Sequence, residues 1–138
     1  MEKSDLQCVS WPKHRDRLKE PITRIGNIAN DPHLYHEINK ACSNEWAFLF
    51  LAQDGFFILR PRHIDKRTFV EVVIASCHGG NAIQRYQHHI IRLAKCGKAK
   101  FIEFATARRG FNKVAPLHGW AHAGVRDDLT VWRHFLED

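Results

Sequence analysis

Two glutamates stand within otherwise apolar segments of the sequence. Glu71 lies in the run FVEVV, and Glu103 lies between Ile102 and Phe104. A carboxylate in such a setting can accept a proton from a substrate as a general base. It can equally lie on a solvent-facing or ion-paired edge of a sheet. Both glutamates are therefore candidates for a catalytic role, with the structural alternative open.

The segment SCHGGN, residues 76–81, separates an apolar run from a segment with helical periodicity. Gly79 and Gly80 would let the backbone come close to a bound group, and His78 could orient a substrate or a phosphate. Cys77 would be a nucleophile only if a neighbouring base lowered its pKa, which nothing in the sequence indicates. A plain tight turn between a strand and a helix explains the same residues equally well.

The ten histidines and the surplus of basic residues raise two further kinds of site. His118 and His122 are four residues apart, but Pro116 and Gly119 argue against a regular helix that would carry both. We therefore expect no metal site. Basic residues cluster around 60–67, and interleaved aromatic residues could stack on bases. Because these aromatic residues belong to apolar strand patterns, direct nucleic-acid binding is possible but not favoured.

The elements that must position these residues begin with a helical N-terminal part, residues 1–45. Pro12 and Pro21 bracket a segment that can form only a short helix. Asp31 is placed to cap a second helix that runs to about Ser43. WAFLFLA, the pair Asp54-Gly55 and FFILR then predict a β-hairpin with Asp-Gly as its two-residue turn, and Pro61 is expected to end it.

A strand, a helix and further strands follow in the remainder of the chain. TFVEVVIAS, residues 68–76, predicts a central strand buried on both faces. Asn81 and Gln84 resemble a capping box at the start of a helix whose apolar stripe includes Tyr86. Gly97 is placed to end this helix in a left-handed conformation. KFIEFAT predicts another strand, RRGFNKVAPLHGW a short broken helix or loop, and LTVWRHFLE a closing strand.

The length and composition are those of one soluble domain over residues 1–138. The 138 residues, 44% of them hydrophobic, suffice for one core. No apolar run approaches the roughly 20 residues of a membrane span, and the N-terminus lacks the pattern of a secretory signal. We therefore expect a cytoplasmic protein without a membrane partner. The net charge of +6 predicts an anionic partner, which nucleic acid, a phosphorylated cofactor and an acidic protein surface all satisfy.

From Thr68 onward, the order of elements resembles the core of the GNAT (Gcn5-related N-acetyltransferase) superfamily. The spacing from Gly79-Gly80 through the helix to residues 94–97, AKCG, is similar to that of the family's cofactor-binding helix. Residues 117–120, LHGW, stand where the family commonly has a Leu-Gly-Phe turn. The resemblance covers roughly residues 48–137. It implies an α/β (α+β) fold with a mixed sheet, in which strands 69–76 and 100–106 are parallel neighbours that diverge beside the start of the helix.

The segment ATARRGF also resembles small GNAT-like proteins encoded in the head-assembly genes of short-tailed phages. That narrower resemblance implies a location in the host cytoplasm or in the phage particle.

The GNAT resemblance implies acetyl-CoA as the cofactor and an amine as the substrate. In such proteins the pantetheine arm lies between the diverging strands, and the pyrophosphate meets the loop and the helix N-terminus. The resemblance also implies a catalytic base among Glu71, Glu103 and His78. The residues that it assigns to cofactor binding are Ile74, Ala75, Ser76, His78, Gly79, Gly80, Asn81 and Arg85.

The sequence departs from the family pattern at two places. Ser76 stands where the loop usually begins with Gln or Arg, and Asn81 replaces its second small residue. Ala115 stands where many members have a Tyr that protonates the leaving thiolate. Two functions therefore stay open. The first is an N-acyltransferase that transfers an acetyl group from acetyl-CoA to an amine. The second is a catalytically silent assembly protein that binds other phage or host proteins.

Overall fold

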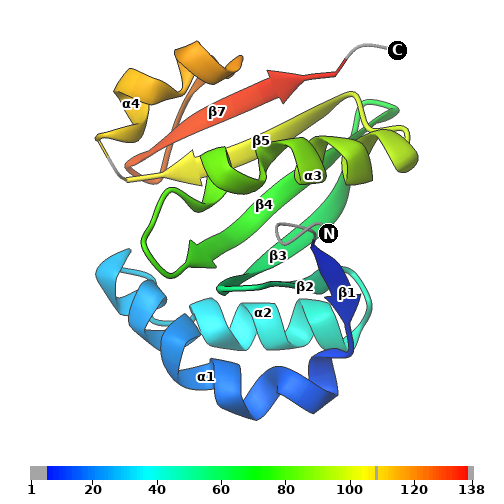
Figure 1. Cartoon of the computed structure of the whole chain (residues 1–138), viewed down its shortest axis with the longest axis vertical. Helices are drawn as coiled ribbons and strands as arrows, with labels where there is room; N and C mark the ends of the chain where they lie inside the picture. The colour runs from blue at the N-terminus through cyan, green and yellow to red at the C-terminus, as the bar shows by residue number, and fades with distance from the viewer. Residues whose placement is uncertain (1–5, 108, 137–138) are drawn as a thin grey trace.

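One mixed sheet of seven strands organises the computed structural model, which describes residues 6–107 and 109–136 (Figure 1). The strand order is β1-β2-β3-β4-β5-β7-β6, and only the β4–β5 pair is parallel. The strands are β1 (Gln7–Val9), β2 (Phe48–Ala52), β3 (Gly55–Ile64), β4 (Arg67–Cys77), β5 (Phe101–Thr106), β6 (Ala121–Arg126) and β7 (Leu129–Phe135). The last two residues of the chain, and with them the end of the predicted closing strand, lie outside the described residues.

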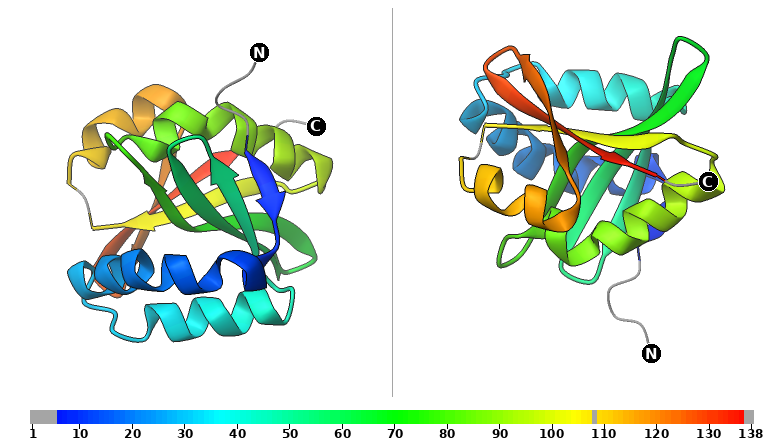
Figure 2. Two further views of the ribbon diagram at one scale, coloured as in Figure 1. Left: turned by 60° about the horizontal axis from the view of Figure 1, so that its bottom comes forward. Right: turned by 90° about the horizontal axis from the view of Figure 1, so that it is seen from above.

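Helices cover both faces of this sheet (Figures 1 and 2). On one face, α1 (Trp11–Ile28) and α2 (Leu34–Ser43) pack on β2, β3 and β4. The other face carries α3 (Ala82–Cys96), α4 (Phe111–Val114) and the 3₁₀ helix η1 (Pro116–His118). Each side has its own cluster of buried apolar residues. The mixed α+β fold predicted from the sequence is therefore confirmed.

The first helix is longer than predicted, because it continues through Pro21. A proline inside a helix removes one backbone hydrogen bond and crowds the preceding turn. Here Leu18 and Ile22 on either side of it are both buried, so apolar contacts of the same helix face offset that loss. In the described part of the chain, no helix combines the length and the apolar character needed to cross a membrane.

The second helix begins later than predicted. It starts at Leu34, and the backbone carbonyl of Asp31, rather than its side chain, accepts a hydrogen bond from the Leu34 N–H at 3.2 Å. The assignment of Asp31 as a side-chain cap is wrong. The predicted apolar face is present, since Ile38 and Cys42 are buried.

The turn between β2 and β3 also differs from the predicted one. Ala52 pairs with Gly55, so Gln53 and Asp54 are its central residues, and neither has a positive φ. Gly55 is needed for another reason: a Cβ there would overlap the carbonyl oxygen of Ser76 and lie 2.5 Å from the Cα of Cys77. The glycine therefore allows the turn to rest directly against the end of β4.

Two edges of the sheet were not apparent from the pattern. β3 does not end at Pro61 but continues to Ile64. Beyond Leu59 it pairs only with β4, so one of its edges is free and the N–H that Pro61 lacks is not needed for pairing on that edge. β6, AHAGVR, is a short strand without large apolar residues apart from Val125, and none of its residues is fully buried. It forms because Asp127 and Asp128, both at positive φ, turn the chain tightly back into β7.

Helix α3 has the predicted bounds but not the predicted end groups. Asn81 is itself left-handed, with φ of 57°, and its side chain makes no capping bond, so the capping box is wrong. At the other end Gly97 has φ of −87°, whereas the next residue, Lys98, is left-handed at 60°. The buried stripe, Ile83, Tyr86 and Ile90 among it, is as predicted.

The divergence of β4 and β5 follows directly from their register. Four pairs join them, from Phe69 with Phe101 to Val72 with Phe104, and the pairing then stops. Beyond this point β4 continues to Cys77 beside β3, while β5 continues to Thr106 beside β7. A bulge in β4 lies at the same place, because Ile58 pairs with Ile74 and Leu59 with Val72. The predicted splayed pair is confirmed, with the start of α3 beside it (Figure 1).

Candidate functional site

The loop that joins β4 to α3 presents backbone N–H groups at the opening between β4 and β5. Gly79, Gly80 and Asn81 have successive φ values of 88°, 78° and 57°. A Cβ at either glycine would meet nothing within 4 Å, so this side of the loop is open. Among the described residues no acceptor is bonded to the N–H groups of Gly79, Asn81 or Ala82. Such a set of amides at the start of a 15-residue helix is suited to bind an anion.

Asp54 holds this loop in place, and sequence analysis treated it only as a turn residue. Its backbone carbonyl accepts a hydrogen bond from the His78 N–H at 2.7 Å. Its carboxylate accepts the Tyr86 hydroxyl at 2.7 Å and pairs with Arg85 at 2.8 Å. The hydrogen bond from Tyr86, followed by that from Arg85, holds the pKa of Asp54 below its ordinary value. The β2–β3 turn is thus fastened to both the loop and the helix.

Arg85 was predicted to add positive charge for a phosphate. In the structure its guanidinium also donates to the carbonyl of His78 and to Sγ of Cys77, each at 3.1 Å. The Cys77 thiol in turn donates to the carbonyl of Gly80 at 3.3 Å. Arg85 therefore lies at the predicted loop, but its contacts are with Asp54 and with the loop itself.

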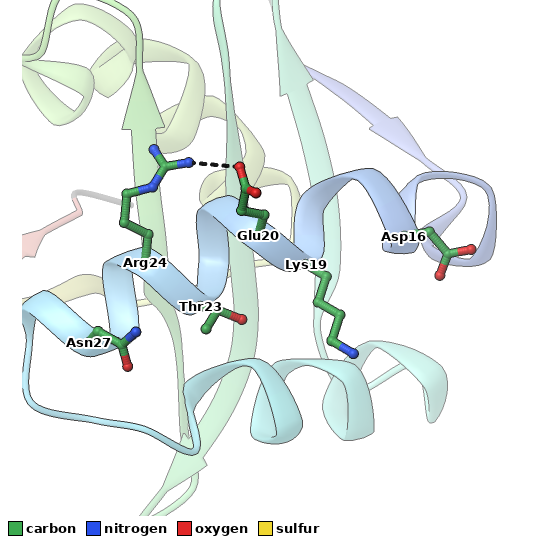
Figure 3. Close-up of a pocket in the computed structure, with 6 residues that line it drawn as sticks. All are labelled: Asp16, Lys19, Glu20, Thr23, Arg24 and Asn27. Atoms are coloured by element: carbon green, nitrogen blue, oxygen red, sulfur yellow. Dashed lines mark hydrogen bonds and ion pairs between the residues drawn. The ribbon is translucent and has the colours of Figure 1, made fainter.

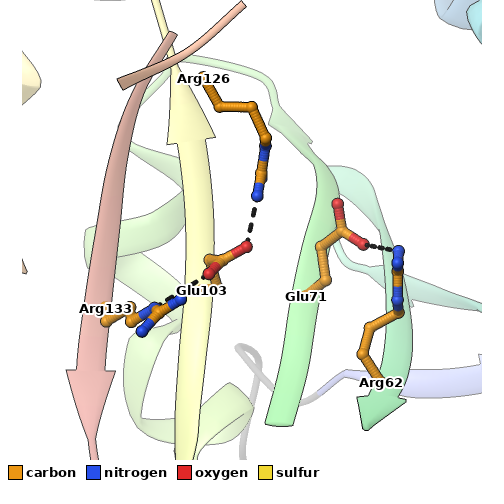
Figure 4. A network of polar contacts seen from close by, with 5 residues as sticks. All are labelled: Arg62, Glu71, Glu103, Arg126 and Arg133. Carbon is orange, nitrogen blue, oxygen red and sulfur yellow. Dashed lines mark hydrogen bonds and ion pairs between the residues drawn. The ribbon is translucent and has the colours of Figure 1, made fainter. Parts of the chain in front are cut away.

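The two candidate glutamates lie side by side on the face opposite α3. They are direct partners in the β4–β5 register, one residue before the last partner on each strand. Glu71 pairs with Arg62 at 2.9 Å, and its side chain is 26% exposed. Glu103 is 4% exposed and pairs with Arg126 at 3.2 Å and with Arg133 at 3.0 Å (Figure 4). Each carboxylate is thus balanced by arginine, and only Glu71 has appreciable contact with solvent.

The remaining predicted residues divide between the core and the loop. Ile74 is buried against α1 and α2, and Ala75 packs on the α3 side, so both contribute backbone rather than side chain to the opening. Ser76 is half-buried at the end of β4. His78 is exposed in the loop, and its ring makes no hydrogen bond with the described residues.

No tyrosine is placed to act as an acid at the opening. Tyr86 is buried, and burial, reinforced by the hydrogen bond to Asp54, raises its pKa to about 12. Ala115, at the position of the family's acid, is fully buried in the α3 cluster. Burial lowers the pKa of His134, but this residue faces Trp120 and Gly119, near the start of β5.

A separate depression of about 490 Å³ runs along α1 (Figure 3). All of its lining residues belong to that helix: Asp16, Lys19, Glu20, Thr23, Arg24 and Asn27. It is shallow, and two of its lining residues, Arg24 and Glu20, form an ion pair of 3.3 Å. Because it shares no residue with the β4–α3 loop, it does not contribute to the candidate site.

Sequence reasoning missed the partners that fix the candidate residues. Asp54 is 32 residues from Tyr86, and Arg126 and Arg133 are 23 and 30 residues from Glu103. No local spacing connects such residues. The two consecutive turn aspartates before β7, Asp127 and Asp128, indicate a tight turn after Arg126.

The sequence matches no family model and no curated protein. The structure, in contrast, is similar to several solved acetyltransferases. FeeM, an N-acyl amino acid synthase from uncultured soil microbes, aligns with a TM-score of 0.69 and 10% identity, covering 98% of this chain and 92% of that one. An acetyltransferase from Streptococcus agalactiae aligns with a TM-score of 0.65 and 14% identity, covering 99% and 100%.

A GNAT-family acetyltransferase from Listeria monocytogenes aligns with a TM-score of 0.63 and 12% identity, covering 95% of each chain. At such low identities the likeness establishes the fold alone. The chain therefore has the fold of the GNAT acetyltransferases, as the order of its elements predicted. The resemblance of ATARRGF to phage head-assembly proteins stays a prediction, and Arg108 within that segment lies outside the described residues.

Proposed function

We propose that this protein binds acetyl-CoA at the opening between β4 and β5 and transfers the acetyl group to an amine. The observation that supports this most is the set of unbonded N–H groups at Gly79, Asn81 and Ala82, in the loop that follows the part of β4 no longer paired with β5. Backbone amides of this kind suit the pyrophosphate of coenzyme A, and the strand opening suits its pantetheine arm.

In this proposal Arg85 and Asp54 are positioning residues. Arg85 donates to His78 and Cys77, and Asp54 accepts from the His78 N–H and pairs with Arg85. These contacts fix the conformation of the loop, and with it the orientation of its N–H groups, in the absence of a ligand. A preformed site of this kind avoids the cost of ordering the loop on binding. Arg85 stays partly exposed, at 43% of its side chain, and adds a positive field without leaving Asp54.

Glu71 is the better-placed general base of the two glutamates, because it is more exposed than Glu103. Glu71 accepts a proton from the amine while the amine nitrogen bonds to the carbonyl carbon and the carbon–sulfur bond breaks. The thiolate leaves with the bonding electrons and takes its proton from solvent, since no tyrosine supplies it. Glu103, which is paired with Arg126 and Arg133, is the neighbour of Glu71 across the β4–β5 register and contributes to its electrostatic environment.

A second candidate function is a non-catalytic one, favoured by the ion pairs that both glutamates already make. A carboxylate paired with arginine is a weaker base than an isolated one. In that case the chain would keep the fold and act as an assembly component through protein–protein contacts.

Titration calorimetry with acetyl-CoA tests the first proposal. We expect micromolar binding that Gly80→Val weakens at least about tenfold, because a β-branched residue at φ of 78° is strained and would cover the amides. Gly124→Val is the matched control: Gly124 has φ of 118° and equally open surroundings, but lies in β6. Its coenzyme affinity should equal that of the wild type.

Turnover with a panel of amines separates the two candidates. Acetylation that Glu71→Gln abolishes, with coenzyme binding retained, supports the enzyme. Binding without turnover for any amine supports the silent protein. An absence of heat and of thermal shift at millimolar acetyl-CoA would overturn coenzyme binding altogether.

A further inference from the structure

Five arginine side chains from four strands lie on the face of the sheet that carries Glu71 and Glu103. Three of them form the ion pairs with these glutamates (Figure 4). Arg60 is the direct partner of Glu71 in the β3–β4 register, and Arg67 lies over the ring of Phe101, two residues before Glu103. We call this set the arginine face; its members are Arg60, Arg62, Arg67, Arg126 and Arg133.

The arginine face is accessible and carries excess positive charge. The side chains of Arg62 and Arg126 are 44% and 53% exposed, and Arg67 is also exposed. Five guanidinium groups stand against two carboxylates, which leaves a net charge of +3. Arg60 and Arg67 form no ion pair with the described residues, so their charges are available to a partner.

Exposed aromatic rings flank the arginine face on two sides. Trp46 is 48% exposed and lies 5.9 Å from the guanidinium carbon of Arg60. Phe135 is 52% exposed, and its ring centre lies 5.6 Å from that of Phe101, which Arg67 and Arg133 cover. The surface therefore offers both cations and ring faces. Guanidinium groups bind phosphate in a bidentate manner and also stack on planar rings.

We propose that the arginine face binds single-stranded nucleic acid. Phosphates would meet Arg60 and Arg67, and bases would stack on Trp46 and Phe135. A sheet surface with exposed aromatics and surrounding cations is a common platform for unpaired bases. An acidic polypeptide would satisfy the arginines but would leave the ring faces unused, so the observations favour nucleic acid. The strands from β3 to β6 span roughly 19 Å, which suits a short oligonucleotide.

Fluorescence anisotropy with a labelled thymidine oligonucleotide of about 12 residues tests the proposal. We expect saturable binding at low salt, with log K falling linearly with log salt concentration. Arg60→Ala combined with Arg67→Ala should weaken binding at least about tenfold and reduce the salt slope by about 1.4, which corresponds to two phosphate contacts. Phe135→Ala should weaken binding severalfold while leaving the slope unchanged, because stacking releases no counterions.

The charge-matched control is Arg15→Ala combined with Arg24→Ala on α1, whose side chains are 42% and 64% exposed and lie outside the arginine face. Its affinity should stay within about twofold of the wild type. Equal weakening by the control pair and the Arg60/Arg67 pair would reduce the effect to overall charge and overturn the proposal. Competition by polyglutamate at the same concentration as by oligonucleotide, with no effect of Phe135→Ala, would also overturn it in favour of an acidic polypeptide. Circular dichroism of each variant establishes that it is folded.

Discussion

At the scale of single residues, Asp54 links more parts of the candidate site than any predicted residue. It contacts the loop through its carbonyl group, and it contacts α3 through Tyr86 and Arg85. Tyr86 is buried, so its hydroxyl depends on this carboxylate for a partner. The conformation of the β4–α3 loop therefore depends on contacts with the β2–β3 turn, which is distant from it in the sequence.

We predict that Tyr86→Phe lowers the free energy of unfolding by about 1–2 kcal/mol at neutral pH, because it removes one hydrogen bond to a charged acceptor and leaves the ring in place. The folded-state pKa of Asp54 is lowered from 3.8, so this stabilisation is present above that value and is lost as pH falls through the lowered pKa. Urea unfolding should therefore show the difference from the wild type shrinking in acid.

Tyr35→Phe is the control for this prediction, since the Tyr35 hydroxyl makes no hydrogen bond with the described residues. It should change stability little at any pH. A loss in Tyr86→Phe that persists undiminished well below pH 3.8 would show that the phenol does not act through Asp54.

At the scale of elements, the contact between the β2–β3 turn and the end of β4 accompanies the part of β4 that is no longer paired with β5. β4 leaves β5 after Val72 but stays paired with β3 as far as Cys77, opposite Gly55. The absence of a side chain at Gly55 permits that last pair, because any Cβ would collide with the backbone of β4. The end of β4 beyond its pairing with β5 is thus supported by a close contact with a glycine of the β2–β3 turn.

Gly55→Ala should therefore cost about 3 kcal/mol of stability, since it forces two backbone segments apart rather than moving a flexible side chain. Gly97→Ala provides a matched comparison: its φ is −87° and the nearest atom to a Cβ is 3.7 Å away. That change should be neutral or slightly stabilising. Chemical denaturation of both variants measures the difference, and equal stability of the two would contradict the contact.

At the scale of the whole molecule, the two halves of the sheet are covered differently. The helices α1 and α2 bury β2, β3 and β4, whereas arginine side chains cover the same face of β5 and β7. Glu103 lies beneath these arginines and connects β5 to the β6–β7 hairpin through both Arg126 and Arg133. On this face, charge pairs therefore add to the ring contacts of Phe101 in joining β5 to the β6–β7 hairpin.

Replacing both Arg126 and Arg133, the partners of Glu103, should lower the free energy of unfolding by more than the sum of the two single replacements. Arg126→Met and Arg133→Met keep the stem of each side chain, and each alone should cost about 1 kcal/mol or less because one guanidinium remains. Together they leave a buried carboxylate unpaired, and we expect a loss of about 3 kcal/mol. Adding Glu103→Gln to the double variant should restore part of that loss. Additive single effects without such restoration would refute the coupling.

The extent to which the sequence determined this protein differs between elements. Local patterns sufficed for β4, β5, β7 and α3, because long apolar runs and a helical stripe have only one way to be buried. They did not suffice for α1, where packing overrides Pro21, or for β6, which depends on β7 as a partner. Gly79 and Gly80 lie in the loop between β4 and α3, as the sequence predicted, because the change from a strand to a helical pattern is visible locally.

The contacts among the candidate site residues were decided by the tertiary structure alone. The pairing of Glu71 with Glu103 needs two strands in parallel register, and the arginines that neutralise them arrive from β3, β6 and β7. The same holds for Asp54 beneath the loop. Sequence spacing encodes which face of an element a residue occupies, but contacts between distant elements follow from how their faces pack, and that is a property of the folded chain.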